Sequence, residues 1–196
     1  MPTGPMPTGL MPNGLVLTGL PGSGASSVAR VLGARHGLPV HDTDREVETR
    51  LGAAASDIFV RQGEQAFREA ERVVALELLA RTVGDRAGEG REPAVVVVGG
   101  GAVAQQAVAE ALRAAAATGV PVVFLDVALP DAARRLGLLG AAPAGLGSPR
   151  ALWQRLADQR RAACRAVASV VVATDGIGVD EVADRVEESS GTEADR

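Results

Sequence analysis

Residues 19–27 read GLPGSGASS, and this stretch decides the fold of the chain. It matches the phosphate-binding loop pattern G-x-x-x-x-G-K-[ST] at every position except Ala25, which stands where the pattern has lysine. An apolar run over residues 15–18 precedes the loop, and a helical pattern over residues 25–36 follows it. Backbone N–H groups surround a phosphate in this strand, loop and helix context. The stretch therefore predicts a phosphate-binding loop formed by Gly22, Ser23, Gly24, Ala25, Ser26 and Ser27.

The usual cation of such a loop is missing, and the chain has no lysine anywhere: all 20 basic residues are arginine. No lysine elsewhere can therefore act as a nucleophile or as a phosphate clamp. Ser26 keeps the hydroxyl that usually ligates Mg²⁺ in this motif. A glycine-rich turn that binds no ligand is the alternative interpretation of this stretch.

Composition narrows the class of protein. The 196 residues are 46% hydrophobic and 22% charged, which is typical of one soluble globular domain. The net charge of −4 argues against nucleic-acid binding, which needs a clustered positive surface. No apolar run approaches the roughly 20 residues of a membrane span. The single cysteine, Cys164, excludes an internal disulfide and favours a reducing compartment. We expect a cytoplasmic monomer.

Short β-branched runs alternate with longer helical patterns along the chain. Uniformly apolar runs are typical of strands that are buried on both faces of a parallel sheet. The pattern predicts an α/β fold, a doubly wound parallel five-stranded sheet flanked by helices, with ligands at the carboxyl ends of the strands. The expected strands are 15–18, 39–41, 95–98, 122–125 and 170–172, and the expected helices are 25–36, 64–82, 103–117, 131–137, 150–166 and 179–188.

Three segments do not fit this alternation of strands and helices. Residues 1–14 repeat a Met-Pro-Thr/Asn-Gly unit, which predicts a flexible leader, with a tag for a partner as the alternative. Residues 137–149 carry no charge and are dense in Gly, Ala and Pro, so we expect a mobile lid within a domain spanning 15–188. The polar residues 189–196 predict a disordered tail.

The second expected strand ends in His41-Asp42-Thr43-Asp44. Two carboxylates at i and i+2 of a strand point the same way, so Asp42 could hold Mg²⁺ while Asp44 contacts a substrate hydroxyl. The same residues are also an ordinary N-cap for a following helix.

Other candidates are ambiguous when each is taken alone. Arg68 and Glu71 are i, i+3 on one helix face and fit a surface ion pair. Gly99, Gly100 and Gly101 fit either a loose turn or a bare backbone against which a ligand ring lies. Arg160 and Arg161 follow the expected lid on a helix, where most arginines are solvated.

Together, in this order and spacing, the motifs resemble the shikimate kinases from about residue 15 to residue 187. Other P-loop kinases, of the gluconate and adenylate types, share the fold but lack DTD followed by FRxxE and GGG. The matching motifs are GLPGSG (19–24), DTD (42–44), DIF (57–59), GEQxFRxxE (63–71), GGGAV (99–103) and an arginine-bearing helix before VASVVVATD (167–175).

The resemblance implies a P-loop kinase fold and ATP-dependent phosphorylation of the 3-hydroxyl of shikimate, a step of aromatic amino-acid biosynthesis. It implies that Asp42 and Ser26 hold Mg²⁺ and that Asp44 contacts the reacting hydroxyl as candidate base. Arg68 and Arg160 would clamp the substrate carboxylate, to which a planar guanidinium is suited. The other implied roles are ring contact for Gly99, Gly100 and Gly101, support of the arginines for Glu71, packing nearby for Phe59, and adenine contact for Arg135.

The chain departs from the family pattern at the phosphates. Besides Ala25, the lid motif Arg-Pro-Leu-Leu reads Ala142-Pro143-Ala144-Gly145, so the lid arginine is also missing. Cys164 replaces a family tyrosine. Losing one preorganised donor costs roughly 10²–10³ in rate. Three hypotheses remain: an impaired kinase in which another arginine, with Arg150 as candidate, stands in; a shikimate-binding protein without catalysis and with a regulatory role; and an enzyme for a related cyclic polyol acid.

Overall fold

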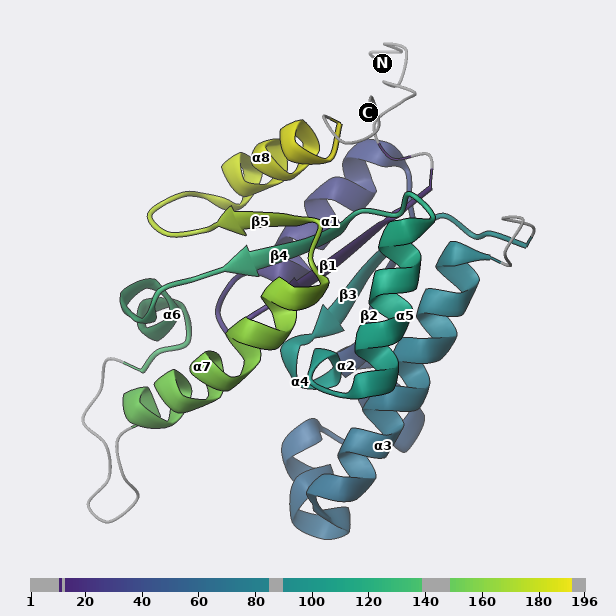
Figure 1. The fold of residues 1–196 in the computed structure, drawn as a ribbon. Helices are drawn as coiled ribbons and strands as arrows, with labels where there is room; N and C mark the ends of the chain where they lie inside the picture. Colours follow the sequence, from purple (N-terminus) through teal and green to yellow (C-terminus); the bar gives the residue numbers. More distant parts are fainter. Residues whose placement is uncertain (1–10, 12, 85–89, 139–148, 192–196) are drawn as a thin grey trace, which may run out of the picture.

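Five parallel strands form one sheet in the order β2-β3-β1-β4-β5, which confirms the expected fold class (Figure 1). The computed structural model describes residues 11, 13–84, 90–138 and 149–191. All five expected strands are present, with β2 beginning and ending one residue later than expected. The strands are β1 (Leu15–Gly19), β2 (Val40–Asp42), β3 (Val95–Gly99), β4 (Val122–Asp126) and β5 (Val170–Ala173).

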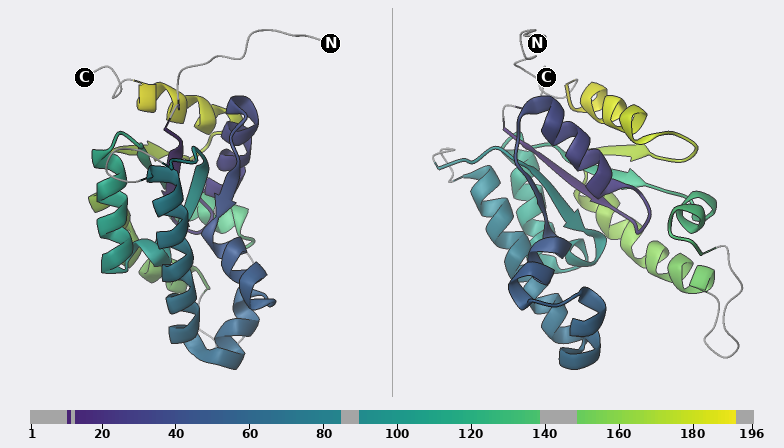
Figure 2. Two further views of the ribbon diagram at one scale, coloured as in Figure 1. Left: turned by 90° about the vertical axis from the view of Figure 1, so that its right-hand side faces the viewer. Right: turned by 180° about the vertical axis from the view of Figure 1, so that it is seen from behind.

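Helices cover both faces of the sheet because successive strand residues point to opposite sides. Leu15 and Leu17 belong to the apolar cluster beneath α1 (Ala25–His36) and α8 (Val179–Gly191). Val16 and Phe124 belong to the cluster on the other face. That cluster packs against α3 (Ala55–Val83), α5 (Gln106–Ala117) and α7 (Pro149–Val167). The views in Figure 2 show the two helical layers on either side of the sheet.

Three shorter helices complete the described part of the fold: α2 (Thr43–Leu51), α4 (Gly100–Val103) and α6 (Leu129–Arg135). The first part of α3 was not expected, and it contains the DIF motif. Gly63, at φ 85° and ψ 164°, interrupts α3 directly before the expected helix 64–82. This positive φ favours glycine and explains why the helical periodicity is not continuous across residue 63.

A few described residues outside the expected domain bounds of 15–188 also belong to the fold. Met11 is buried, and the N–H of Gly14 donates to the Met11 carbonyl oxygen at 3.2 Å. At the other end, α8 continues to Gly191. None of the described helices combines the length and the apolar character needed to cross a bilayer.

The parallel arrangement brings the carboxyl ends of all five strands to one edge of the sheet. β1 leads into the phosphate loop, β2 ends at Asp42, β3 ends at Gly99 and β4 ends at Asp126. The residues that follow buried strands in a parallel sheet face a common crevice. The fold therefore gathers the candidate residues of several motifs at one place.

Candidate active site

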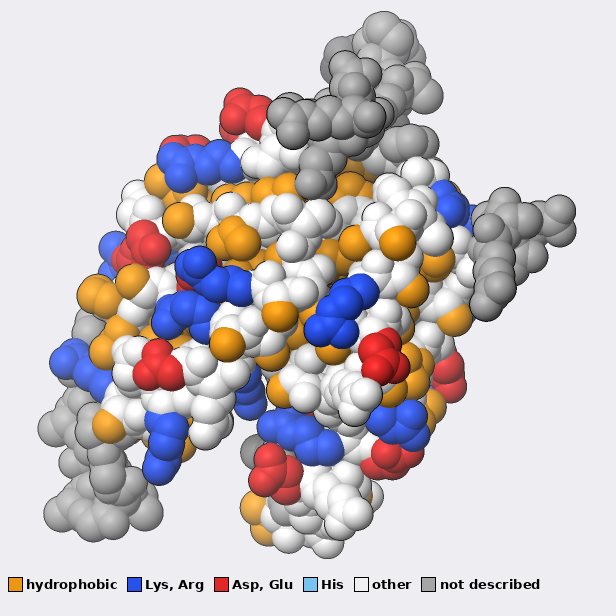
Figure 3. Space-filling model, viewed as in Figure 1, with side chains coloured by type: hydrophobic (Ala, Val, Ile, Leu, Met, Phe, Trp, Pro, Cys, Tyr) orange, Lys and Arg blue, Asp and Glu red, His pale blue; other side chains and the backbone are white. Residues whose placement is uncertain are grey.

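A cavity of about 820 Å³ lies at the carboxyl ends of the strands. On the face drawn in Figure 3, the molecule is hollowed between α7 and the N-terminal part of α3, and arginine side chains stand on both sides of the hollow. The sequence candidates that line the cavity are Gly22, Ser23, Gly24, Ala25, Ser26, Ser27, Asp42, Asp44, Arg68, Glu71, Gly99, Gly100, Gly101, Arg135 and Arg160.

The phosphate loop has the backbone shape that its glycines predict. Gly24, the residue before α1, has φ 88°, a left-handed conformation that side-chain-bearing residues rarely adopt. Ala25 is the first residue of α1, and it lines the cavity. The N-terminus of a helix presents free N–H groups and a partial positive charge to an anion. The loop thus keeps its backbone donors, while Ala25 has only a methyl group where the pattern has a lysine side chain.

Asp42 uses its two carboxylate oxygens separately. Its Oδ1 accepts a hydrogen bond from the Asp44 backbone N–H at 3.1 Å, which caps α2. Its Oδ2 accepts a hydrogen bond from the Ser26 hydroxyl at 2.7 Å. The expectation that both carboxylates share one strand is wrong, because β2 ends at Asp42 and Asp44 lies in the first turn of α2. Asp42 is thus the N-cap of α2, as the alternative interpretation predicted, and both Asp42 and Asp44 also line the cavity.

Ser26 and Asp42 together offer the oxygen ligands that suit Mg²⁺. Magnesium in phosphotransfer sites is usually held by one or two protein oxygens, by substrate phosphates and by water. A hydroxyl and a carboxylate in direct contact, beside a phosphate-binding loop, are a donor set of this kind. The residues present fit the metal.

Asp44 faces the cavity and is shielded by its walls. The residue keeps exposed surface, and a Cβ at Gly99 would lie 2.8 Å from its Oδ1. Burial from bulk water, together with the nearby carboxylates of Glu71 and Asp42, raises the pKa of Asp44 to about 6. Asp44 is ionised at pH 7 and is a stronger base than an ordinary aspartate.

Glu71 holds Arg68 from beneath the cavity. Arg68 Nη1 donates to Glu71 Oε2 at 2.8 Å, and Glu71 is only 2% exposed. Burial raises the pKa of the Glu71 carboxyl against the opposing effect of Arg68. The pair is therefore not the solvated surface pair that the i, i+3 spacing allows. The Arg68 guanidinium also lies over the Phe67 ring, with 5.6 Å between its Cζ and the ring centroid.

Arg160 is half-buried on the opposite wall, on α7. In the described part of the chain, no carboxylate lies within ion-pair distance of its guanidinium. Burial lowers the pKa of Arg160 and the positive charge of Arg68 lowers it further, with partial compensation from Glu71 and Asp44. An arginine nevertheless stays protonated in proteins. Two guanidinium groups that face one cavity, one of them without a paired carboxylate, make a site for an anion.

The three glycines at the end of β3 and the start of α4 leave room for neighbouring atoms where other residues would have a Cβ. A Cβ at Gly101 would lie 2.3 Å from Arg68 Nη1, and one at Gly100 would lie 2.9 Å from the Gly19 carbonyl oxygen. A Cβ at Gly100 would therefore meet backbone, whereas one at Gly101 would displace the end of the Arg68 side chain. The close approach is thus made, at Gly99 and Gly101, by Asp44 and Arg68 of the protein itself.

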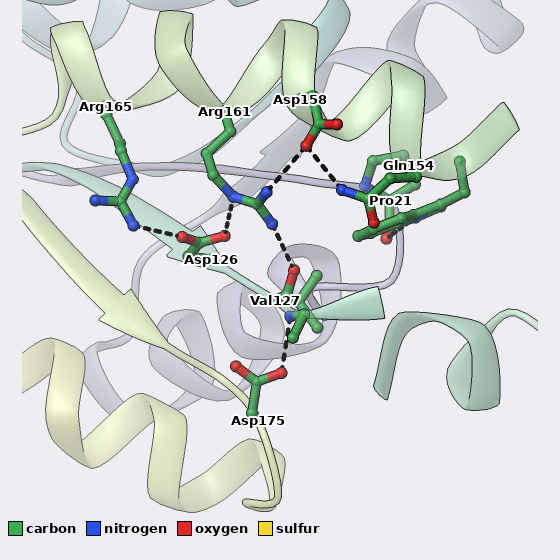
Figure 4. A network of polar contacts seen from close by, with 10 residues as sticks. Pro21, Asp126, Val127, Gln154, Asp158, Arg161, Arg165 and Asp175 are labelled. Atoms are coloured by element: carbon green, nitrogen blue, oxygen red, sulfur yellow. Dashed lines mark hydrogen bonds and ion pairs between the residues drawn. The ribbon is translucent and has the colours of Figure 1, made fainter. Parts of the chain in front are cut away.

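Arg161, next to Arg160, faces another direction and anchors α7 to the sheet. Its Nε donates to Asp126 Oδ1 at 2.9 Å, and Arg165 Nη2 donates to Asp126 Oδ2 at 2.7 Å (Figure 4). These bonds lower the pKa of the Asp126 carboxyl against the effect of its partial burial. The two adjacent arginines therefore have different tasks, since Arg160 borders the cavity and Arg161 fixes its helix.

A protein-family model described as shikimate kinase matches residues 21–190. The chain belongs to the shikimate kinase family. A shikimate kinase of Thermobifida fusca (strain YX) is 40% identical over 166 residues, which are 85% of this chain and 88% of that relative. One of Salinispora tropica is 40% identical over 163 residues, 83% of this chain and 89% of the relative. Among solved structures, shikimate kinase from Acinetobacter baumannii in complex with shikimate has a TM-score of 0.73 at 27% identity, and the match covers 88% of this chain and 89% of that one.

The family resemblance also singles out Arg135 and Phe59. Arg135 lines the cavity, but its guanidinium is held by protein acceptors: Nη1 donates to the Gly22 carbonyl oxygen at 3.1 Å and Nη2 to the Thr174 carbonyl oxygen at 2.5 Å. Phe59 lies in α3, and its side chain is outside the described part of the structure.

The expected lid, residues 137–149, lies mostly outside the described residues, and so does Ala142. Arg150, the candidate substitute for the loop lysine, is exposed at the start of α7 and is not among the lining residues. Its Nε donates to the Leu138 carbonyl oxygen at 3.2 Å.

Sequence reasoning missed part of the lining. Glu48, Ala55 and Phe67 border the end of the cavity near Arg68, while other missed residues follow β5. The loop TDGIGVD at the carboxyl end of the last apolar run could have indicated this second group, because such loops face the same crevice. The lining residues there are Ile177 and Gly178 in the loop and Val179 and Val182 at the start of α8.

Proposed function

We propose that this chain transfers the γ-phosphoryl group of ATP to the 3-hydroxyl group of shikimate. The observation that carries the proposal is the half-buried Arg160, which faces Arg68 across the cavity without a paired carboxylate of its own. A substrate carboxylate would supply the missing negative charge and would accept hydrogen bonds from both guanidinium groups. Family membership names the acid, since the matched relatives are shikimate kinases.

Asp44 supports the transfer at the other end of the substrate. Its pKa of about 6 leaves it ionised at pH 7 and able to accept a proton. As the substrate oxygen bonds to the γ-phosphorus, the bond to the ADP oxygen breaks and the hydroxyl proton passes to Asp44 Oδ. A carboxylate so placed contributes roughly 10²–10⁴ to the rate of such a step.

The phosphate loop supports nucleotide binding. Its backbone N–H groups and the N-terminus of α1 hold the phosphates, and Ser26 and Asp42 would hold Mg²⁺. The metal, when bound, neutralises charge on the phosphate oxygens. Ile177, Gly178 and Val179 offer an apolar edge of the same cavity for the nucleotide base.

Ala25 favours a second candidate function. A loop without its cation loses charge stabilisation that matters most in phosphoryl transfer, whereas the substrate end keeps its arginines. The chain would then bind shikimate, or a related cyclic polyol acid, without phosphorylating it and would act as a regulator. The intact Asp44 and Mg²⁺ ligands favour the enzyme over this alternative.

Mass spectrometry of shikimate 3-phosphate tests the proposal. Purified protein is incubated with millimolar Mg-ATP and shikimate, and the Asp44→Asn variant controls for contaminating kinase. We expect product from the wild type and far less from the variant. Equal product from both proteins would contradict the role of Asp44, and no product from a folded wild type would contradict the enzyme itself.

Calorimetry separates the second candidate. A binding protein should bind shikimate, lose that binding in Arg68→Ala and make no product.

We also propose that the protein works as a cytoplasmic monomer. Its single cysteine is buried and unpaired, which supports a reducing compartment.

A further inference from the structure

Arg30 lies at the outer side of the phosphate loop. It follows Ser26 by four residues on α1, so their backbones are about 6 Å apart along the helix axis. Helical side chains lean toward the N-terminus, and a long arginine side chain covers the turn before its own Cα. The contacts agree: Arg30 Nε donates to the Ser26 carbonyl oxygen at 3.1 Å, and Nη2 donates to Ser27 Oγ at 3.2 Å.

The guanidinium has donors to spare. Arginine has five N–H groups, and these two bonds occupy two of them. Arg30 is exposed, and in the described part of the chain no carboxylate is within ion-pair distance of it. Its charge is therefore neither neutralised nor buried.

Ser27 connects this charge to the cavity, because it lines the cavity while its Oγ accepts from Arg30. A hydroxyl oxygen that accepts from a cation still has its own proton to donate. A phosphate beside Ser27 can thus receive the hydroxyl proton and a free Arg30 N–H together, as a charge-assisted pair.

We propose that Arg30 supplies the positive charge that the phosphate loop lacks, by binding the nucleotide phosphate nearest Ser27. The inference rests on the proposed use of ATP. Arg135 fits the task less well, because its Nη1 and Nη2 are already bonded to the loop and to Thr174. Neither Arg30 nor Arg150 is among the lining residues, but Arg30 contacts the lining residue Ser27, whereas Arg150 Nε donates to the Leu138 carbonyl oxygen.

The test compares ADP binding by the wild type and by Arg30→Gln, measured by calorimetry in the presence of Mg²⁺. Losing a hydrogen bond to a charged group weakens binding roughly 10-fold to 100-fold. We expect this loss for ADP and no change for adenosine, which has no phosphate. Arg113→Gln, an equally exposed arginine on α5 that does not line the cavity, is the matched control and should bind ADP normally. Arg30→Lys should keep part of the affinity.

A second readout uses the missing lysine. In an Ala25→Lys background, the loop has its own cation, so Arg30→Gln should weaken ADP binding much less than in the wild-type background. An unchanged penalty would mean that the two positions do not share a task, and would overturn the proposal.

Failure of this inference differs from failure of the proposed function. If the wild type makes shikimate 3-phosphate and Arg30→Gln binds ADP normally, the role of Arg30 is overturned and the kinase stands. If the wild type makes no product but Arg30→Gln loses ADP affinity selectively, the role of Arg30 is supported and the kinase fails. A selective loss in Arg150→Gln, or absence of ADP binding by the wild type, overturns the inference.

Discussion

The indole Nε1–H of Trp153 donates a hydrogen bond to the Pro21 carbonyl oxygen at 2.9 Å. Trp153 is 5% exposed and lies on α7, one helical turn after Pro149, while Pro21 belongs to the phosphate loop. The bond therefore ties the nucleotide end of the cavity to the helix that carries Arg160. Loop and helix are positioned by the same contact.

Trp153→Phe should weaken both ends of the site together. The phenylalanine keeps most of the apolar contact but leaves the Pro21 carbonyl without its donor, which costs about 1 kcal/mol of unfolding free energy. We expect a lower urea midpoint and higher KM values for both ATP and shikimate. A change in only one KM would show that the contact does not couple the two ends.

Asp44→Asn should lower turnover and stabilise the fold at pH 7. The pKa of Asp44 is about 6 in the folded protein and 3.8 without its surroundings, so the folded state binds this proton more tightly. Ionised Asp44 is then a cost to stability that is fully present above about pH 6, declines as the pH falls and is absent below 3.8. Thermal melts should show a gain for the variant at pH 7 that vanishes by pH 3.5.

The pH dependence of wild-type activity should follow the ionisation of Asp44. Below pH 6, kcat/KM should fall about tenfold per pH unit as Asp44 becomes protonated. A profile that stays flat down to pH 5 would contradict Asp44 as the base.

Gly101→Ala should displace Arg68. The added Cβ would lie 2.3 Å from Arg68 Nη1, so the guanidinium must move away from the position set by Glu71. We expect the KM for shikimate to rise roughly tenfold or more, since a charge-assisted bond depends on its geometry. The KM for ATP should be unchanged, and an equal rise in both would indicate general damage to the fold.

Asp126→Asn should loosen α7. The change removes the negative charge shared by Arg161 and Arg165 and should cost about 1–3 kcal/mol of unfolding free energy. Because the pKa of Asp126 is lowered by its partners, its contribution is present at neutral pH and is lost as the pH falls below about 3.8. Urea denaturation at pH 7 and at pH 3 should therefore show a smaller difference between variant and wild type at the lower pH.

Restoring the lysine tests whether the phosphate loop can support faster phosphoryl transfer. Ala25 borders the cavity at the first position of α1, so Ala25→Lys places an ammonium where the motif normally has one. Turnover should rise roughly 10²-fold or more, and further with Ala142→Arg. No gain in a folded double variant would show that the phosphate end differs in more than these two positions.

The sequence predicts the sheet and the phosphate loop well because both depend on local signals. Uniformly apolar runs identify the strands, and β3 and β4 each extend only one residue beyond the expected run. The sequence did not predict the first part of α3, which contains the DIF motif. Gly63 has a positive φ that breaks the helical periodicity, so the residues on its two sides do not read as one helix.

Side-chain partners were the least predictable feature. The spacing of Arg68 and Glu71 is the same for a solvated pair and for a buried one, and only the packing of α4 over Glu71 decides between them. Arg160 and Arg161 are adjacent in sequence, but they lie on different faces of α7. Arg160 therefore lines the cavity, whereas Arg161 contacts Asp126. Arg30 escaped notice because nothing in its spacing distinguishes it from a solvated helix arginine.

The two carboxylate oxygens of Asp42 make two independent contacts. The oxygen that holds the start of α2 is not the one that meets Ser26. A cation bound at Oδ2 would therefore replace the hydrogen bond from Ser26, while Oδ1 would keep its hydrogen bond to the first turn of α2. Under the proposed function, the metal could then bind and leave with each nucleotide without unfolding the start of this helix.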